Sequence, residues 1–364
     1  MAQLDSSHPA SDLTSDPSIC VSPIVHRAKT RRELEAVYRF RYEVYYREFG
    51  RLLGRPDHAE RQVRDDADEL PTTTILYTGT PDRITSTVRL QHWRPGEVPD
   101  HDGRELSMDR IPAYRSLACA EIGRLMVRPS RRGQALVTAL VKRAYEIFVG
   151  EHQSRLVFCY CSPGLTHFYR RIAMRPYGGR LVAAPDGLMI PLVSVTSDRE
   201  YYEAVGSFLS PMVERYFGPG SSKLEPTDLK PLRSAFESPG LELDRGRVEA
   251  ALETVPSMGA WLGAPGSAYR RRLLTGALVV DVEVGTLVTR RGFREPELFV
   301  VLEGEVSTTG APARGAGQCF GEAGLLSEDG RRCHTWRCRS AGRLLVLSGR
   351  AARSVLRRRD REVA

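Results

Sequence analysis

The sequence predicts two folded units, an α+β domain built on a central sheet and then a small antiparallel barrel or jelly roll. Three features indicate this order: a strand, turn and helix at residues 120–148, a Gly-, Pro- and Ser-rich stretch at residues 218–240, and short strands at turn-marked intervals after it. With 364 residues, 41% of them hydrophobic, the chain is long enough to bury two cores.

The expected boundaries follow from composition. Residues 1–24 are rich in Ser, Asp and Pro and predict a disordered tail. Residues 25–217 form the first domain, 218–240 a linker, and 241–364 the second domain.

Charge and cysteine content narrow the classes of partner. The formal charge of +8 suits nucleic acid, lipid headgroups or an acidic carrier. Seven cysteines without Cys-x-x-Cys spacing suggest neither a disulfide framework nor a zinc site, so no metal is expected, and Cys159 and Cys161 are expected along a strand. No apolar run approaches the roughly 18 residues that span a bilayer, and no signal peptide is evident. We expect a cytoplasmic protein.

The strand, turn and helix at residues 120–148 are the centre of the first domain. Residues 121–127 alternate, which predicts a strand with Glu121 and Arg124 on opposite sides. Apolar residues three and four apart then predict a helix from Gln134 onward. Free N–H groups at such a turn can hold a phosphate, although an ordinary β-turn-α unit with Gly133 at the corner is the alternative.

The turn resembles the acyl-donor turn of the GNAT acyltransferase superfamily, through Val-x-Pro-x-x-Arg-Gly-x-x-x-x-x-Ala-Leu at Val127 to Leu140. The resemblance implies an α+β GNAT (acyl-CoA N-acyltransferase) fold in which turn N–H groups bind a pantetheine pyrophosphate. The implied donor-binding residues are Leu125, Val127, Arg132, Gly133, Ala135 and Val137. Val137 stands where the family has a small residue. Its side chain leaves less room for a pyrophosphate to approach the turn, which argues against a conventional acetyl-CoA donor.

Further features look like N-acyl amino acid synthases and acyl-homoserine-lactone synthases. They are an Arg-x-x-Val-aromatic helix at Arg41, an Asp-x-x-Asp element, an arginine on the second strand, and Glu-x-x-Arg-x-x-Val. The resemblance implies Glu121 as general base with Arg124 in the catalytic set. It makes acceptor or structural candidates of Arg41, Asp65, Asp68 and Arg89. An amphipathic helix and a solvated acidic loop remain the alternatives.

The same resemblance favours a long acyl chain delivered on acyl-carrier protein. That carrier is acidic, and three arginines at positions 128, 131 and 132 offer it a docking surface. Downstream, Thr166–Gly178 looks like the GNAT Phe-Tyr-x-x-x-Gly-Phe segment, which implies that Tyr169 protonates the leaving thiolate. A core aromatic is the alternative for Tyr169. An apolar stripe predicts one helix over residues 198–217.

The second domain resembles the cyclic-nucleotide-binding domain, a β-roll or jelly roll with flanking helices. Strands are expected at residues 277–283, 286–290, 298–302, 305–309 and 343–347, and the Phe-Gly-Glu turn begins at Phe320. The resemblance implies a nucleotide site made of Gly321, Glu322, Ala323, Arg332 and Cys333, with Arg331 as a neighbour that could substitute. Gly324 and Cys333 depart from the family pattern, and a thiol is a poor donor to phosphate. A barrel that has lost its ligand is the alternative.

Together these features predict an N-acyltransferase that uses acyl-carrier protein or acyl-CoA and a small amine, such as an amino acid, and is regulated by cAMP or cGMP. Two alternatives stay open: a non-catalytic regulatory protein, and a cAMP-regulated protein lysine acetyltransferase that uses acetyl-CoA. No helix-turn-helix follows the barrel, so DNA is not an expected partner. Peripheral contact with membrane lipid is compatible with the basic charge.

Overall fold

The computed structural model describes residues 23–50, 55–111, 114–131, 135–177, 182–184, 187–220, 224–237, 241–255, 267–295, 297–327, 329–349 and 353. The predicted tail therefore lies almost wholly outside the described residues, as do Arg132 and Gly133 of the predicted donor turn.

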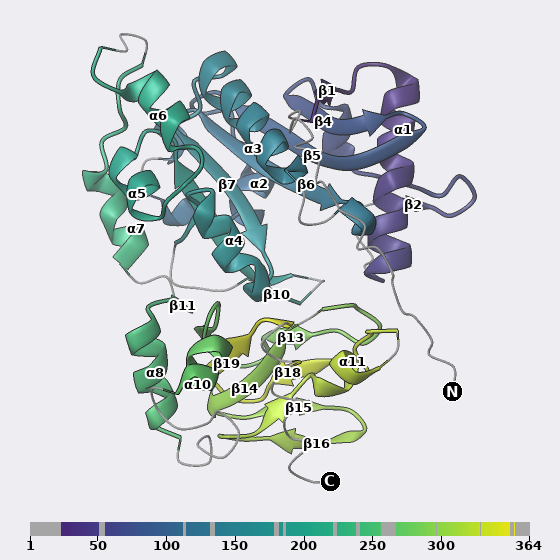
Figure 1. The fold of residues 1–364 in the computed structure, drawn as a ribbon, viewed down its shortest axis with the longest axis vertical. Coiled ribbons are helices and arrows are strands. Elements are labelled where there is room, and N and C mark those ends of the chain that lie inside the picture. Colours follow the sequence, from purple (N-terminus) through teal and green to yellow (C-terminus); the bar gives the residue numbers. More distant parts are fainter. Residues whose placement is uncertain are drawn as a thin grey trace, which may run out of the picture.

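The first domain is a twisted sheet covered on both faces (Figure 1). Its strand order is β1-β4-β5-β6-β7-β10-β8, with β9 paired to β10, and β6 and β7 form its one parallel pair among the described residues. The strands are β1 (Val25–Arg27), β4 (Thr73–Thr80), β5 (Arg83–Trp93), β6 (Cys119–Val127), β7 (Leu156–Cys161), β8 (Arg175–Pro176), β9 (Val182–Ala184) and β10 (Gly187–Val195), and a separate hairpin joins β2 (Arg55–Asp57) and β3 (Gln62–Arg64). The helices are α1 (Arg31–Tyr42), α2 (Asp100–Glu105), α3 (Leu136–Tyr145), α4 (Thr166–Arg171), α5 (Arg199–Ala204), α6 (Ser210–Phe217) and α7 (Arg233–Glu237).

Helix α1 begins with a local capping signal. Thr30 and Glu33 form a capping box, which satisfies backbone N–H groups of the first turn. The helix continues as a π-helical turn over Glu43–Glu48. Val37, Phe40 and Val44 are buried in one apolar cluster with residues of β4 and β5, so this face of the helical segment packs on the sheet.

The two faces of the sheet have separate cores. Ala120, Ile122 and Cys159 share one apolar cluster with α3. Cys119 and Phe158 face the other way, into a cluster that also holds side chains of residues 229–236. Residues 218–240, which composition predicts as a connecting segment, therefore supply part of the cover of the first domain.

A bulge interrupts β6 and corrects the expected strict alternation. The pairing with β5 shifts between Thr87 and Arg89, and Arg124 adopts a left-handed φ of 54°. Beyond the bulge Met126 packs with the α1 cluster while Leu125 packs with the α3 cluster. The prediction that Arg124 points away from Glu121 was wrong, because the extra residue reverses the parity of the strand.

The single helix expected over residues 198–217 is two helices, α5 and α6. Asp198 caps α5 by accepting a hydrogen bond from the backbone N–H of Tyr201, and after α5 Gly206 adopts a φ of 61°, which ends the helical path. Pro211 lies in the first turn of α6, where its missing N–H costs nothing. The apolar spacing misled because both short helices bury the same side.

The second domain is a two-sheet antiparallel sandwich flanked by helices (Figure 1). One sheet has the order β11-β12-β19-β14-β17 and the other β13-β18-β15-β16. The strands are β11 (Leu241–Glu242), β12 (Leu278–Val282), β13 (Leu287–Thr289), β14 (Leu298–Glu303), β15 (Val306–Thr308), β16 (Ala311–Arg314), β17 (Cys319–Phe320), β18 (Trp336–Cys338) and β19 (Gly342–Leu347), and the helices are α8 (Arg245–Glu253), α10 (Ala268–Leu273) and α11 (Glu322–Leu326). The strands expected from turn spacing are confirmed.

The core of the sandwich is continuous with that of the first domain. Phe299, Phe320 and Trp336 stack between the two sheets. They belong to the same buried cluster as Leu188 and Ile190 of β10, and β13 lies beside β9 and β10. Alternate residues of β14 and β19 face α8 and α10 on the outer side. The two domains are thus joined by apolar packing as well as by the chain.

Candidate functional site

Six charged side chains from four segments form one ion-pair network beside β6. Asp65 lies at its centre and accepts hydrogen bonds from Arg124, at 2.6 and 2.9 Å, and from Arg89, at 3.4 Å. Arg89 also donates to both oxygens of Glu121, at 3.1 and 2.8 Å. At the other end Arg41 donates to Asp68 at 2.5 Å and lies 3.9 Å from Asp65. The structure therefore brings together all six predicted residues of this set.

Exposure rises along the network. The side chains of Arg41 and Asp68 are 0% exposed, whereas those of Glu121 and Arg124 are 17% and 22% exposed. Three arginines balance three carboxylates, so the network is close to neutral. The buried end fixes the geometry, and the partly exposed end, at Glu121 and Arg124, is where a substrate can make contact.

The sequence places these groups through local structure. The bulge at Arg124 turns its side chain toward Asp65, on the same side as Glu121. Asp65 caps a short 3₁₀ turn over Asp66–Glu69 and exchanges backbone hydrogen bonds with Asp68. The Asp-x-x-Asp spacing is therefore a capping box whose two carboxylates also bind arginines.

Burial tends to raise the pKa of Asp65, but the charges of Arg124, Arg89 and Arg41 more than offset it and hold that pKa below its usual value. Because its pKa is lower in the folded state, the ionised Asp65 stabilises the fold at pH values above the unfolded pKa of about 3.9. This stabilisation is lost as the pH falls through the folded-state pKa. We expect Asp65→Asn to cost less stability at a pH of about 3 than at about 6, because protonation removes the same charge. Urea unfolding at the two pH values measures this, and an equal cost at both would contradict it.

Strands β6 and β7 part beside Glu121. Their pairing covers Cys119–Glu121 opposite Leu156–Phe158 and ends there in the described residues of both strands. The second half of β6, with the predicted donor residues Leu125 and Val127, is therefore not paired with the described part of β7. Ligands of parallel sheets bind at such carboxyl ends.

The donor turn itself is only partly described. Arg132 and Gly133 lie outside the described residues, and Ala135 is the N-cap residue of α3. Val137 is half-buried and packs against the core. The role of this set stays a prediction.

Tyr169 lies on α4, half-buried against the core on the α3 side of the sheet, and meets Phe168 edge to face. Glu121 lies on the other face of the sheet, on the same side as Phe158, its neighbour across β6 and β7. The two residues predicted as acid and base therefore approach the parting strands from different faces.

Two polar residues that sequence reasoning missed lie beside Glu121. Gln91 pairs with Glu121 across β5 and β6, and Tyr160 lies two residues beyond Phe158 on β7. Nε2 of Gln91 and the hydroxyl of Tyr160 are buried without a hydrogen-bond partner among the described residues. Burial, with the charges of Glu105 and Glu121, raises the pKa of Tyr160, so its hydroxyl remains a donor. The two-residue period from Arg89 and Phe158 is the signal that could have found them.

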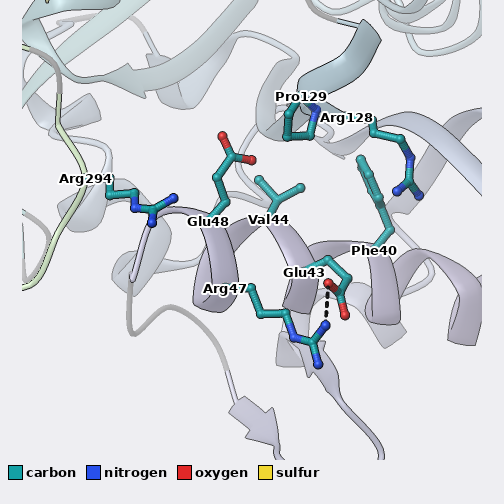
Figure 2. A pocket seen from close by; sticks show the side chains of 8 residues that line it. All are labelled: Phe40, Glu43, Val44, Arg47, Glu48, Arg128, Pro129 and Arg294. Carbon is teal, nitrogen blue, oxygen red and sulfur yellow. Dashed lines mark hydrogen bonds and ion pairs between the residues drawn. The ribbon is translucent and has the colours of Figure 1, made fainter. Parts of the chain in front are cut away.

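A cavity of about 290 Å³ lies at the carboxyl end of β6, between the two domains (Figure 2). Figure 2 shows Arg128 and Pro129 on one side, the end of the first helical segment below, and Arg294 of the second domain reaching in from the opposite side. Its lining residues are Phe40, Glu43, Val44, Arg47, Glu48, Arg128, Pro129 and Arg294. Arg294 of the second domain thus lines one side of a cavity next to the predicted donor turn.

The predicted nucleotide residues are assembled at one end of the sandwich, with an unexpected arrangement of Arg332. Gly321 adopts a φ of 90° and precedes the five-residue helix α11, which carries Glu322 and Ala323. Arg332 is 2% exposed and donates to the carbonyl oxygens of Gly321 and Glu297, each at 2.7 Å. The guanidinium therefore holds the protein's own turn, and a phosphate would have to displace these contacts.

The two departures from the nucleotide-binding pattern have different explanations. A Cβ on Gly324 would lie 3.0 Å from the carbonyl oxygen of Arg331, so the close approach of the chain there favours glycine. Cys333 is exposed, and nothing in the structure explains a thiol at that position. Arg331, the other candidate for the phosphate, donates to the carbonyl oxygen of Gly292 at 2.7 Å.

The remaining sequence expectations concern cysteines, metals and membranes. The six described cysteines are unpaired, and Cys159 and Cys161 lie on β7 as expected. His101, Asp102 and Glu105 form the one group of three potential metal ligands found in the described part of the chain, on the surface helix α2. None of the described helices combines the length and hydropathy required to cross a bilayer.

The match of residues 36–196 to a family model gives the class of protein: the first domain has the GNAT fold, and the chain is an N-acyltransferase enzyme. Residues 36–196, which hold the whole ion-pair network, match the family model described as N-acyl amino acid synthase FeeM. No curated protein matches the chain.

The solved structures to which the chain is similar include two synthases and a sensor domain. FeeM, an N-acyl amino acid synthase from uncultured soil microbes, is 13% identical, with 52% of this chain and 97% of that chain covered and a TM-score of 0.40. BjaI, a CoA-dependent acyl-homoserine lactone synthase, is 15% identical, with 58% and 97% covered and a TM-score of 0.40. The sensor domain of the transcriptional regulator DNR from Pseudomonas aeruginosa is 20% identical, with 30% and 76% covered and a TM-score of 0.27.

Proposed function

We propose that this N-acyltransferase moves an acyl group from acyl-carrier protein or acyl-CoA to the amine of an amino acid or a related small amine in the cytoplasm. The observation that carries the proposal is the ion-pair network, whose partly exposed end lies where β6 and β7 part. Acyl transfer needs a thioester held still beside a group that accepts the amine proton. Glu121 is that group, and Tyr169 on α4 supplies the proton to the leaving thiolate.

The charge balance of the network favours an amino acid as acceptor. Glu121 attracts an ammonium group, and Arg124, 22% exposed, attracts a carboxylate. A zwitterion keeps the six-residue network neutral, whereas a simple amine adds an uncompensated charge to a partly buried site. Gln91 and Tyr160 then bind the polar atoms of the acceptor, which would give their buried groups the partners they lack in the described residues.

Arginines at the donor edge support the acidic carrier protein as the source of the acyl group. Arg128 lies at the end of β6 and lines the cavity there.

The test is acyl transfer by the full chain from matched acyl-carrier-protein and acyl-CoA donors to a panel of amino acids, amines and a lysine-containing peptide. Amino acid products from the carrier donor support the proposal. Transfer to the peptide alone would replace it with a lysine acyltransferase, and no transfer to any acceptor would overturn it.

Tyr160→Phe separates acceptor binding from structural support. Removing a buried hydroxyl without a partner should leave stability unchanged or slightly higher. If the hydroxyl binds the acceptor, its loss should raise the acceptor KM about five- to tenfold, the equivalent of one hydrogen bond. Steady-state kinetics and thermal unfolding of the same preparation measure both. An unchanged acceptor KM would remove Tyr160 from the site, and Tyr114→Phe, on the same face, is the matched control.

The second domain is proposed to sense a cyclic nucleotide and thereby regulate the transferase. The support is the turn at Gly321 and Glu322 with Arg332 against it. Calorimetry of the full chain with cAMP and cGMP tests this, and no heat at millimolar ligand would leave a barrel without a nucleotide. The non-catalytic alternative is not favoured, because the chain is an enzyme.

A further inference from the structure

One loop of the second domain lies against two segments of the first domain that flank the predicted acyl-transfer site. We call residues 292–295 and 297 the barrel strap. The backbone N–H of Arg294 donates to the carbonyl oxygen of Phe49, at the end of the first helical segment, at 2.9 Å. The carboxylate of Glu297 accepts a hydrogen bond from the backbone N–H of Gly164 at 3.2 Å. The strap therefore contacts the two segments of the first domain, at Phe49 and at Gly164, that flank the predicted acyl-transfer site.

Gly164 lies at a position that matters for acyl transfer. It belongs to the turn Pro163–Leu165, which follows the carboxyl end of β7 and leads directly into α4 with Tyr169. Because β6 and β7 are parallel, this turn lies at the same edge of the sheet as the donor turn after Val127. The position of Gly164 sets where α4 begins.

The contact between Glu297 and Gly164 is close and specific. Glu297 is 3% exposed. A Cβ on Gly164 would lie 2.9 Å from Cδ of Glu297, which is nearer than side-chain carbons approach. An alanine at 164 would therefore have to displace the carboxylate of Glu297.

Arg332 fixes that carboxylate in turn. Its guanidinium lies 3.7 Å from the Glu297 carboxylate and 3.8 Å from that of Glu295, and it donates to the main-chain oxygen of Glu297. A buried carboxylate needs such a partner, since an unpaired charge at this depth is strongly unfavourable. The same guanidinium holds Gly321, so one side chain links the predicted nucleotide turn to the strap.

We propose that Glu297 is a positioning residue of the acyl-transfer site, contributed by the second domain: it holds the Gly164 amide and so places the start of α4 against the acyl donor. The inference rests on the proposed acyl transfer by the first domain. It does not depend on nucleotide binding.

The test compares Glu297→Ala, Glu297→Gln and Gly164→Ala in the full chain, with Glu303→Ala as control, at the exposed end of the strand β14 that follows Glu297. Glu297→Ala removes the acceptor for the Gly164 N–H, so exchange of the amides at residues 164–171 should accelerate and the KM for the acyl donor should rise about tenfold, with a smaller change in kcat. Glu297→Gln keeps an acceptor oxygen, and Glu295 still pairs with Arg332, so this variant should restore both readouts. Gly164→Ala, which displaces the carboxylate, should resemble Glu297→Ala.

Hydrogen exchange keeps this inference separate from the proposed function. Exchange at residues 164–171 of Glu297→Ala that equals the wild type would overturn the positioning role, whether or not activity is found. Accelerated exchange with an unchanged donor KM would overturn it as well, because the contact would then be structural only. A wild-type chain without acyl transfer defeats the proposed function, and with it the inference.

Discussion

Glu121→Gln should lower kcat/KM for acyl transfer by about 10²- to 10⁴-fold, the usual contribution of a general base. The replacement keeps the shape of the side chain and one oxygen that can accept from Arg89, but an amide cannot take the proton of the acceptor amine. Arg89 keeps Asp65 as a partner at 3.4 Å, so the fold should persist.

The measurement is acyl transfer with saturating donor, together with donor affinity by calorimetry. The matched control is Glu97→Gln, which changes an exposed glutamate three residues before α2 and should behave as wild type. An active Glu121→Gln enzyme would assign the proton to another group and leave Glu121 as a partner of Arg89 alone.

The largest effect on stability is expected at the buried end of the network. Asp68→Asn leaves the guanidinium of Arg41, which is 0% exposed, without its main counter-charge. Breaking a buried pair in this way costs about 3 to 5 kcal/mol of unfolding free energy. Asp65 lies 3.9 Å from Arg41 and shares its charge, so we expect the lower end, about 3 kcal/mol.

Urea unfolding gives the comparison, and the same helical segment offers the control. Glu43→Gln breaks the exposed pair with Arg47 and should cost no more than about 1 kcal/mol. The double replacement Arg41→Met with Asp68→Leu removes both charges and should be less destabilised than the sum of the single changes. A cost for Asp68→Asn as small as for Glu43→Gln would mean that water reaches the pair.

The sequence predicted the centre of the first domain from two local signals: alternation in the first half of β6 and an apolar stripe in α3. It also identified the six residues of the network one by one, through resemblance. It could not pair them. Alternation put Arg124 on the wrong side of β6, because a bulge of one residue leaves no clear mark in composition.

Contacts between segments that are distant in the sequence could not be predicted either, because no local pattern of residues marks them. Gln91 and Tyr160 stand out only once β5, β6 and β7 are aligned, and Glu297 only once the second domain is seen against Gly164. Arg332 was predicted to bind a phosphate, but its guanidinium donates hydrogen bonds to the carbonyl oxygens of Gly321 and Glu297. A buried guanidinium must find acceptors whether or not a ligand is present.

The shared apolar core has a consequence for how this protein can change over evolutionary time. Leu188 and Ile190 of the first domain and Trp336 of the second are buried in one cluster, so loss of the second domain would expose apolar surface on the transferase. Selection on the enzyme alone would then retain the barrel. The residues predicted to bind a nucleotide could then change, as Cys333 differs from the family pattern, while the fold is maintained. The barrel can therefore persist as a structural part of the enzyme, whether or not it binds a ligand.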